Sequence, residues 1–427
     1  MQENFDKLYR AFINSTGVFT DTRKPLDQGV FFALSGPNFN GNQYAEAALK
    51  SGASIAVVDD EEYVQENCIL VEDSLETLQE LANHHRNQFD IPVFALTGSN
   101  GKTTTKELIS AVLSSHYNII STSGNFNNHI GVPLTLLRIK PETEIAVIEM
   151  GANHVGEIGA LCKIADPTHG LITNIGKAHL EGFGSYEGIL RGKSELYDHL
   201  RKKGGQVFIN SSDPVLSNMG KRFEAPLYFP NKGDFYHCEM IKSEPFVRIR
   251  TDGREIDTQL IGAYNFTNAA AALCLGKYFQ VPVTSAEIAV RDYVPEMNRS
   301  QVITKGSNTI ILDAYNANPD SMKAALDNLK ATDSEQKIVI LGDMLELGES
   351  TQSEHEELGR QVVAIGPKQA LFCGELVKYA SEVVPGSKHF PTKGELTNYL
   401  KDQYITDSTI LIKASRGIGL ETIMDVF

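Results

Sequence analysis

The chain has 427 residues, 41% of them hydrophobic, and a formal net charge of −15. This charge disfavours binding to nucleic acid and to anionic membrane surfaces, although an anionic small substrate needs only a local basic pocket. No apolar run is long enough to cross a bilayer, and the polar N-terminus predicts no signal peptide. Five cysteines without a C-x-x-C pair indicate reduced thiols, so we expect a cytoplasmic protein.

The first 88 residues predict a small α/β domain. Residues 30–34 form an apolar strand that ends at a Ser-Gly-Pro turn, and residues 55–58 form a second buried strand. Helices are expected at 44–49 and from Ser74 to about residue 85, with Ser74 as the N-cap. A polar stretch before Pro92 marks the first domain boundary, so we place this domain at 1–88.

A phosphate-binding loop opens the second segment, residues 89–296. The sequence V-F-A-L-T-G-S-N-G-K-T-T-T, from Val93 to Thr105, predicts a strand, a glycine turn and a helix start, a layout that binds polyphosphates. Lys102 supplies a charge for the outer phosphates, and the Thr103 hydroxyl suits a magnesium ion. Gly98 and Gly101 are separated by two residues, whereas the standard loop has about four before its Gly-Lys pair.

Polar residues follow several predicted strands of this segment. Glu149 follows the strand at 146–148 and His179 follows the strand at 170–175, where ligands bind in a parallel sheet. Glu149 suits a magnesium ion, the alternative being an acid at a helix start. His179 is either a ligand or a structural histidine. Lys193 lies in the helix at 186–199 and is either a functional lysine or a solvated one. Alternation around Asp252-Gly253 predicts a small antiparallel addition within 234–261.

The third segment, residues 297–427, predicts a second α/β sheet. Apolar strands at 309–312, 337–341, 370–373 and 409–412 alternate with helical patterns. The run from Asp313 to Pro319 is too polar for a core turn and indicates a binding loop. Arg299, near the boundary, is either a surface arginine or a phosphate ligand from the neighbouring domain. If Arg299 and Asp313 belong to the ATP site, this domain must close onto the second one.

Several sequence strings resemble those of the Mur ligases and the related folylpolyglutamate synthases. The short loop T-G-S-N-G-K-T-T has the form of that family. Further matches begin at Asp21, Asn125, Glu149, Asp313 and Lys413 with D-T-R, N-F-N-N-H, E-M-G-A-N-H, D-A-Y-N-A-N-P and K-A-S-R. These strings cover all three segments. The resemblance implies three domains: a small N-terminal α/β domain for a UDP-sugar, a central phosphate-loop ATPase with a parallel sheet, and a Rossmann-like C-terminal domain.

The resemblance also implies a reaction. The γ-phosphate of ATP would pass to the terminal carboxylate of UDP-N-acetylmuramoyl-tripeptide, and D-alanyl-D-alanine would displace phosphate from the acyl phosphate, in cytoplasmic peptidoglycan synthesis. It would link the protein to cell wall biogenesis, cell shape and cell division, and imply a monomer. The third peptide residue, lysine or diaminopimelate, stays open. The alternatives are a sister ligase, such as another Mur ligase or a folylpolyglutamate synthase, and a nucleotide-dependent switch protein.

Residue roles follow from the same resemblance. The phosphates would be bound by Gly98, Ser99, Asn100, Gly101, Lys102, Thr103 and Thr104, with Arg299 on the γ-phosphate, Asp313 on the ribose, and Asn265 and Asn268 on the adenine. One magnesium ion would be held by Thr103 and Glu149, and a second by His179 and a carbamylated Lys193. The catalytic residues would be Lys102, His179, Lys193 and Arg299. The substrates would contact Thr22, Arg23, Ser35, Asn125, Asn128, Asn316, Asn318, Ser415 and Arg416. Tyr264 stands where the family usually has histidine, and Ala414 where it has glycine.

Overall fold

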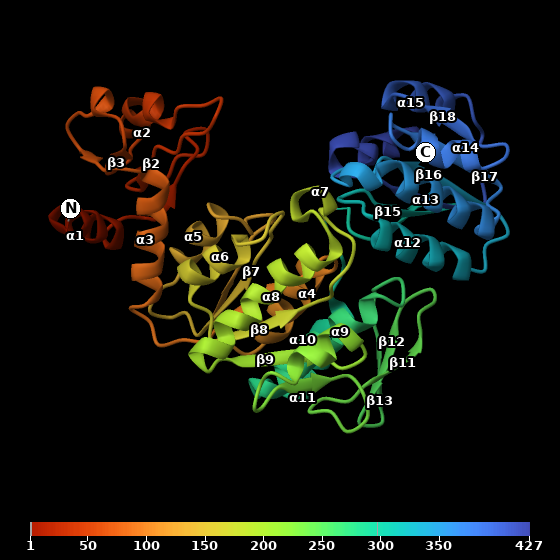
Figure 1. Cartoon of the computed structure of the whole chain (residues 1–427), viewed down its shortest axis with the longest axis horizontal. Helices are drawn as coiled ribbons and strands as arrows, with labels where there is room; N and C mark the ends of the chain where they lie inside the picture. Colours follow the sequence, from red (N-terminus) through yellow and green to blue (C-terminus); the bar gives the residue numbers. More distant parts are fainter. Residues whose placement is uncertain (1, 297) are drawn as a thin grey trace.

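A computed structural model describes residues 2–296 and 298–427 as three lobes, each built around its own sheet (Figure 1). The N-terminal lobe has a four-stranded parallel sheet in the order β1-β2-β3-β4. Its elements are α1 (Gln2–Ile13), β1 (Val18–Phe19), β2 (Val30–Phe32), α2 (Ala45–Lys50), β3 (Ile55–Val58), β4 (Cys68–Leu70) and α3 (Ser74–Arg86). The sequence did not predict α1.

Helix α3 joins this lobe to the central one. Its N-cap is Asp73, whose carboxylate accepts the Glu76 N–H at 2.8 Å, so the prediction of Ser74 was wrong by one residue. Leu78 and Leu81 pack in the same apolar cluster as residues of the central sheet. The Arg86 guanidinium, buried at the far end of the helix, donates to the Ala165 carbonyl at 3.1 Å.

The central lobe has a six-stranded, all-parallel sheet in the order β10-β9-β8-β5-β7-β6. Its strands are β5 (Val93–Thr97), β6 (Ile119–Ser121), β7 (Ile145–Glu149), β8 (His169–Ile172), β9 (Gln206–Asn210) and β10 (Leu227–Phe229). The helices are α4 (Lys102–Ser114), α5 (Gly131–Leu136), α6 (Glu157–Ala165), α7 (Leu180–Phe183), α8 (Tyr186–Lys203), α9 (Pro214–Gly220), α10 (Asn265–Tyr278) and α11 (Val283–Asp292).

Strand β5 is buried on both faces because helices cover the sheet on either side. Val93 and Ala95 pack with α6 and α8, whereas Phe94 and Leu96 pack with α4, α10 and α11. A continuous apolar strand is what such double burial requires. The predicted antiparallel addition is confirmed as β11 (Glu239–Lys242), β12 (Arg248–Thr251) and β13 (Arg254–Asp257), with a turn at Asp252-Gly253 in which both residues have positive φ.

The C-terminal lobe has a six-stranded sheet in the order β14-β15-β19-β16-β17-β18, parallel except for the edge strand β14. Its elements are β14 (Gln301–Lys305), β15 (Asn308–Asp313), α12 (Pro319–Ala331), β16 (Lys337–Gly342), α13 (Thr351–Ile365), β17 (Gln369–Cys373), α14 (Lys378–Val383), β18 (Lys388–Phe390), α15 (Lys393–Lys401) and β19 (Thr409–Lys413). The predicted α/β class with three domains is confirmed. The predicted start of the third domain, residue 297, lies outside the described residues.

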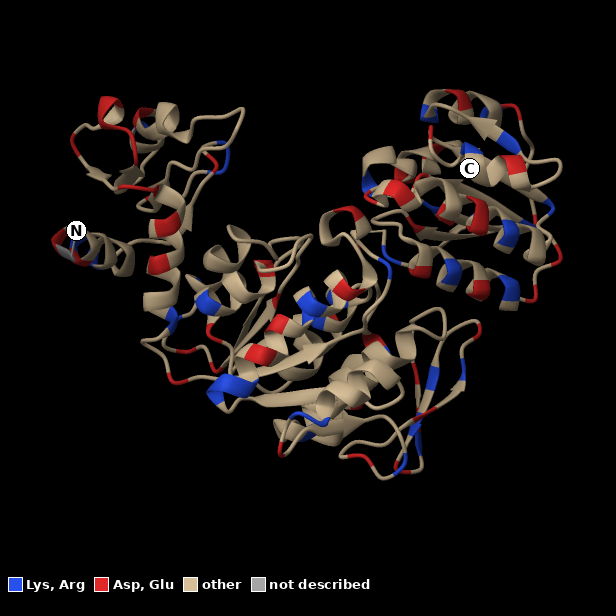
Figure 2. Ribbon diagram, in the orientation of Figure 1, with Lys and Arg blue, Asp and Glu red and all other residues tan. Residues whose placement is uncertain are grey.

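Charged residues of both signs lie on the outer helices α12 and α13 (Figure 2). Several form ion pairs one turn apart, such as Lys323 with Asp327 and Arg360 with Glu357. Exposed pairs of this kind contribute little to stability. In the described part of the chain, no helix combines the length and the apolar character needed to traverse a lipid bilayer.

Candidate active site at the carboxyl ends of the sheets

The loop after β5 requires glycine at two positions. Gly98 has a φ of 149°, and a Cβ there would lie 2.0 Å from the Thr173 hydroxyl oxygen; Gly101 has a φ of 76° and caps α4. The end of β8 holds the loop from the side: Asn174 Oδ1 accepts the Asn100 N–H at 2.9 Å, and Thr173 Oγ1 donates to the Asn100 carbonyl at 2.7 Å. The loop amides are therefore fixed before any phosphate arrives.

Thr103 and Glu149 meet at the start of α4. Thr103 Oγ1 donates to Glu149 Oε1 at 3.2 Å, and Asn127 Nδ2 donates to the same oxygen at 2.8 Å. The other oxygen, Oε2, is buried without a hydrogen-bond partner. A buried carboxylate oxygen without a partner is costly, and a hydroxyl beside it completes a donor set that suits Mg²⁺. The residues present therefore fit a magnesium ion at this position.

Lys102 lies across the loop, with Nζ donating to the Gly98 carbonyl at 2.8 Å. Burial lowers the pKa of Lys102, nearby Glu149 acts to raise it, and Arg299 acts to lower it further. Arg299, which precedes β14 of the C-terminal lobe, is therefore close enough to the loop to act on its lysine. The structure brings these two predicted catalytic residues together from different lobes.

Lys193, in α8, is completely buried. Its Nζ donates to the Ala152 carbonyl at 3.0 Å and lies 5.1 Å from the centre of the Phe183 ring. Burial first, and Lys102 second, hold the pKa of Lys193 well below its ordinary value, against the opposing effect of nearby glutamates. Such burial favours the neutral amine of a lysine over the ammonium form, and a neutral amine is a nucleophile.

His179 does not contact Lys193. Its Nδ1 is paired with the Glu346 carboxylate of the C-terminal lobe, and both residues have positive φ, 55° and 61°. Within residues 2–296 and 298–427, no three His, Cys, Asp or Glu side chains gather into a group suited to a metal. The assignment of His179 and Lys193 to a second ion therefore stays a prediction.

The C-terminal lobe is docked on the central one. Asn318 Nδ2 donates to Asn100 Oδ1 at 2.7 Å, and Asp320 accepts the Lys177 N–H at 2.7 Å. Lys177 Nζ also forms an ion pair with Glu354 at 2.5 Å. Asn318 additionally caps α12, where Ser321 completes a capping box. The two lobes are therefore in contact beside the phosphate loop, and both contribute residues to one site.

Two of the predicted arginines lie against the Tyr315 ring, in the loop between β15 and α12. The guanidinium carbon of Arg299 is 3.7 Å from the ring centre and that of Arg416 is 5.0 Å from it. Arg299 lies between Asn298 and Ser300, which have positive φ of 56° and 51°. Ser300 touches both lobes, because its hydroxyl bonds the Tyr264 hydroxyl at 2.7 Å and its N–H donates to Asp313 at 3.2 Å.

Other predicted site residues already have protein partners. The Asp313 carboxylate accepts from buried Lys413 at 2.5 Å. Asn268 Oδ1 accepts from the Thr105 hydroxyl at 3.0 Å, and the same side chain lies against Gly101, so Asn268 supports the phosphate loop. Its Nδ2 donates to Asn265 Oδ1 at 2.8 Å.

The remaining predicted residues lie near turns. Ser415 Oγ accepts the Leu345 N–H at 3.0 Å, while Asn316 Oδ1 accepts the N–H of its neighbour Ala317. Asn128 Oδ1 accepts the Gly131 N–H at 2.9 Å at the start of α5, whereas Asn125 is exposed.

A hollow of about 880 Å³ lies in the N-terminal lobe and includes Ser35. Phe39 and Tyr44 stack beside it, with ring centres 5.3 Å apart, and both are largely exposed. Arg23 is paired with Asp21 at 2.8 Å, a bond that lowers the pKa of Asp21 to about 2. Thr22 shares this loop but does not line the hollow.

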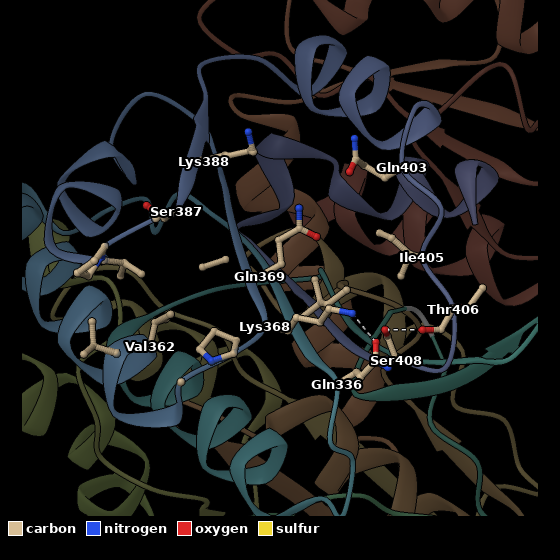
Figure 3. Close-up of a pocket in the computed structure, with 18 of the residues that line it drawn as sticks. Gln336, Val362, Lys368, Gln369, Ser387, Lys388, Gln403, Ile405, Thr406 and Ser408 are labelled. Carbon is tan, nitrogen blue, oxygen red and sulfur yellow. Dashed lines mark hydrogen bonds between the residues drawn. The ribbon is translucent and has the colours of Figure 1, made fainter.

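A second hollow, of about 510 Å³, lies in the C-terminal lobe at the amino ends of β16, β17 and β18 (Figure 3). None of the predicted site residues lines it. Its lysines already have partners, since Lys368 donates to Gln336 at 2.7 Å and Lys388 lies 5.1 Å from the centre of the Tyr399 ring. It is separate from the site, because the site lies at the opposite, carboxyl ends of the strands.

Four residues without a predicted role lie in the site in the structure: Asn127, Asn174, Lys177 and Glu346. Two signals were available. Asn127 and Glu346 fall inside polar strings, and Asn174 and Lys177 follow the strand that precedes His179.

Fold and site together define a phosphate-loop nucleotide-binding protein whose site is completed by a second α/β domain. Family models match along the chain: "Mur ligase family, catalytic domain" at residues 14–86, "Mur ligase middle domain" at 96–276 and "Mur ligase, glutamate ligase domain" at 298–416. The chain belongs to the Mur ligase family.

Named relatives and solved structures agree with this assignment. The chain is 36% identical to the UDP-N-acetylmuramoyl-tripeptide–D-alanyl-D-alanine ligase of Bacillus subtilis, over 96% of this chain and 92% of that protein. It is 33% identical to the Escherichia coli protein of the same name, over 98% and 95%. A crystal structure of MurF from Acinetobacter baumannii is similar with a TM-score of 0.87 and 29% identity, over 99% and 97% of the two chains. MurF from Thermotoga maritima in complex with ADP is similar with a TM-score of 0.85 and 26% identity, over 97% of each chain.

Proposed function

We propose that this protein is the ATP-dependent ligase that joins D-alanyl-D-alanine to the terminal carboxylate of UDP-N-acetylmuramoyl-tripeptide in peptidoglycan synthesis. The observation that carries the proposal is the phosphate loop with Thr103 beside the unpartnered Glu149 oxygen, closed over by a lobe that brings Arg299. Full-length similarity to relatives with this name supports the choice of substrates.

The reaction has two steps, and its main difficulty is charge. A carboxylate oxygen bonds to the γ-phosphorus as the bond to the β-phosphate oxygen breaks, and ADP leaves. The amine nitrogen of D-alanyl-D-alanine then bonds to the acyl carbon as the carbon–oxygen bond to phosphate breaks, and a proton leaves the nitrogen. The loop amides, Lys102 and Arg299 stabilise the negative charge that develops on the phosphoryl oxygens.

Magnesium ions, one at Thr103 and Glu149 and a second at His179 and a carbamylated Lys193, would add positive charge beside the outer phosphates. The lowered pKa of Lys193 supports the carbamate, because it favours the unprotonated amine that reacts with carbon dioxide. Docking of the C-terminal lobe excludes water, which would otherwise hydrolyse an acyl phosphate.

Residues of all three lobes bind the remaining parts of the substrates in this proposal. The hollow beside Ser35, with Thr22 and Arg23 nearby, takes the UDP-sugar. Asn316, Asn318, Ser415 and Arg416 face the dipeptide, Asn125 and Asn128 face the tripeptide substrate, and Asn265, Asn268 and Asp313 bind the nucleoside of ATP. We further propose that the protein is a cytoplasmic monomer whose product serves cell wall synthesis, cell shape and division.

Phosphate release tests this function against its rivals. We expect release from ATP only when a muramyl tripeptide and D-alanyl-D-alanine are both present, and the lysine and diaminopimelate tripeptides, assayed separately, identify the natural third residue. Stimulation by folate plus glutamate instead would indicate the sister activity, and turnover independent of both pairs would indicate a switch protein. Lys102→Ala serves as the control for phosphate released by contaminants.

A further inference from the structure

Two guanidinium groups converge on one aromatic ring at the carboxyl edge of the C-terminal sheet. Arg299 and Arg416 lie 3.7 Å and 5.0 Å from the centre of the Tyr315 ring. Their charged carbon atoms are therefore no further apart than the sum of these two distances. Arg299 comes from the linker before β14, whereas Arg416 follows β19, so residues more than a hundred positions apart in the sequence meet at this ring.

Nothing acidic offsets the charge of the two arginines. In residues 2–296 and 298–427, neither forms an ion pair with Asp or Glu, and Arg299 Nε is buried without a hydrogen-bond partner. Two like charges this close repel each other, and the negative face of an aromatic ring is what attracts them here. Arg416 is exposed to water, whereas Arg299 is half-buried with an unpartnered Nε, so this pair of cations predicts an anionic ligand that Arg299 contacts.

The backbone around Tyr315 is held rigidly. The buried ammonium group of Lys413 donates to the Asp313 carboxylate at 2.5 Å and to the Asn316 carbonyl at 2.9 Å, on either side of the tyrosine. Tyr315 itself has no hydrogen bond from its hydroxyl in the described structure. These contacts therefore fix the position of the Tyr315 ring, and its face is the part that contacts the two arginines.

We propose that Tyr315 is a positioning residue that holds Arg299 and Arg416 as a pair, so that both guanidiniums face the acyl phosphate between ATP and the incoming dipeptide. The inference rests on the proposed function. Arg299 is on the phosphate side, since its neighbour Ser300 bonds Tyr264 at 2.7 Å, at the start of the helix α10 whose Asn268 lies against Gly101 of the phosphate loop. Arg416 is on the acceptor side, next to Ser415 at the end of β19. The Tyr315 ring would thus set the distance between the Arg299 guanidinium, which contacts the phosphoryl group, and the Arg416 guanidinium, which contacts the dipeptide.

Steady-state kinetics of single and double variants test the proposal. Tyr315→Leu removes the ring, and we expect the KM for ATP and the KM for D-alanyl-D-alanine each to rise about tenfold. Tyr315→Phe keeps the ring and should recover most of this loss. Because Tyr315 acts through the arginines, Tyr315→Leu should add nothing to the KM for D-alanyl-D-alanine in an Arg416→Ala background, or to the KM for ATP in an Arg299→Ala background.

Controls separate positioning from folding. Tyr379→Leu is the matched variant, because Tyr379 lies 5.2 Å from the Lys378 ammonium in α14, away from the site, and should leave both KM values unchanged. If Tyr315→Leu unfolds at the assay temperature, Tyr315→Met, whose unbranched flexible side chain adapts to the space without a ring, takes its place. Equilibrium binding of a non-hydrolysable ATP analogue gives a second readout for each variant.

Three results would overturn the inference while leaving the proposed function intact: a Phe variant as impaired as the Leu variant, a change in only one KM, or additive effects in the double variants. A wild-type protein that releases no phosphate in response to D-alanyl-D-alanine would overturn the proposed function, and this inference with it.

Discussion

Lys177 contacts Asp320 and Glu354 of the C-terminal lobe, so we expect these contacts to favour the docked form over an open one. Asp320→Ala/Glu354→Ala removes a charge-assisted hydrogen bond of 2.7 Å and an ion pair of 2.5 Å. Because the Lys177 side chain is 50% exposed, we assign each contact about 0.5–1 kcal/mol rather than the value of a buried pair. Losing about 1–2 kcal/mol lowers the closing equilibrium constant about five- to thirtyfold.

Small-angle scattering with a non-hydrolysable ATP analogue and tripeptide measures this closure. We expect the ligands to reduce the radius of gyration of the wild type, and the double variant to need higher ligand concentrations for the same change. Lys323→Ala/Asp327→Ala removes a surface ion pair within α12 and serves as the control. Closure as complete in the double variant as in the wild type, at equal ligand, would refute the reasoning, as would a wild-type profile that ligands leave unchanged.

Three further variants test single groups. Glu149→Gln keeps an acceptor for the Thr103 hydroxyl and removes the negative charge. Calorimetry should therefore show loss of Mg²⁺ binding, and kcat should fall about a hundredfold or more. The thermal stability of the variant should equal that of the wild type. Lys193→Ala should abolish activity. In the wild type, buffer free of carbon dioxide should lower activity, and added bicarbonate should restore it. A wild-type rate that is unchanged in buffer free of carbon dioxide would contradict the carbamate. Burial lowers the pKa of His169 to about 4. Its contribution to stability is therefore complete above pH 6.5 and is lost as pH falls toward 4, by about 2 kcal/mol between pH 7 and pH 5. Urea unfolding at pH 7 and pH 5 measures the loss of unfolding free energy between the two pH values. We expect this loss to be about 2 kcal/mol smaller in His169→Gln than in the wild type. An equal loss in the two proteins would contradict the assignment to His169.

The local parts of the site could be predicted because their signals are continuous in the sequence. Strand, glycine turn and helix start fall within the thirteen residues Val93–Thr105, and Glu149 follows an apolar strand directly. The roles of Asn127 and Asn174 could not be predicted, since they depend on β7 and β8 lying on either side of β5, which is a property of the sheet order.

Other differences have equally physical causes. Asp73 and Ser74 are both good cap formers, and only the backbone conformation decides between adjacent oxygens. Strand β14, with its alternately exposed residues, lies at a sheet edge and carries a weak apolar signal. The pairing of His179 with Glu346 joins two surface loops of different lobes, so it depends on the docking angle rather than on any local pattern.

The linker around Ser300 has a consequence for how the site would open. Ser300 is bonded to Tyr264 of the central lobe and to Asp313 of the C-terminal lobe, directly beside Arg299. Because Arg299 and Arg416 lie on one ring of the C-terminal lobe, both guanidiniums would move with that lobe. Opening would therefore break the bond between Ser300 and Tyr264 and withdraw both charges from the central sheet in one movement, so that a single domain motion would assemble or dismantle both ends of the site together.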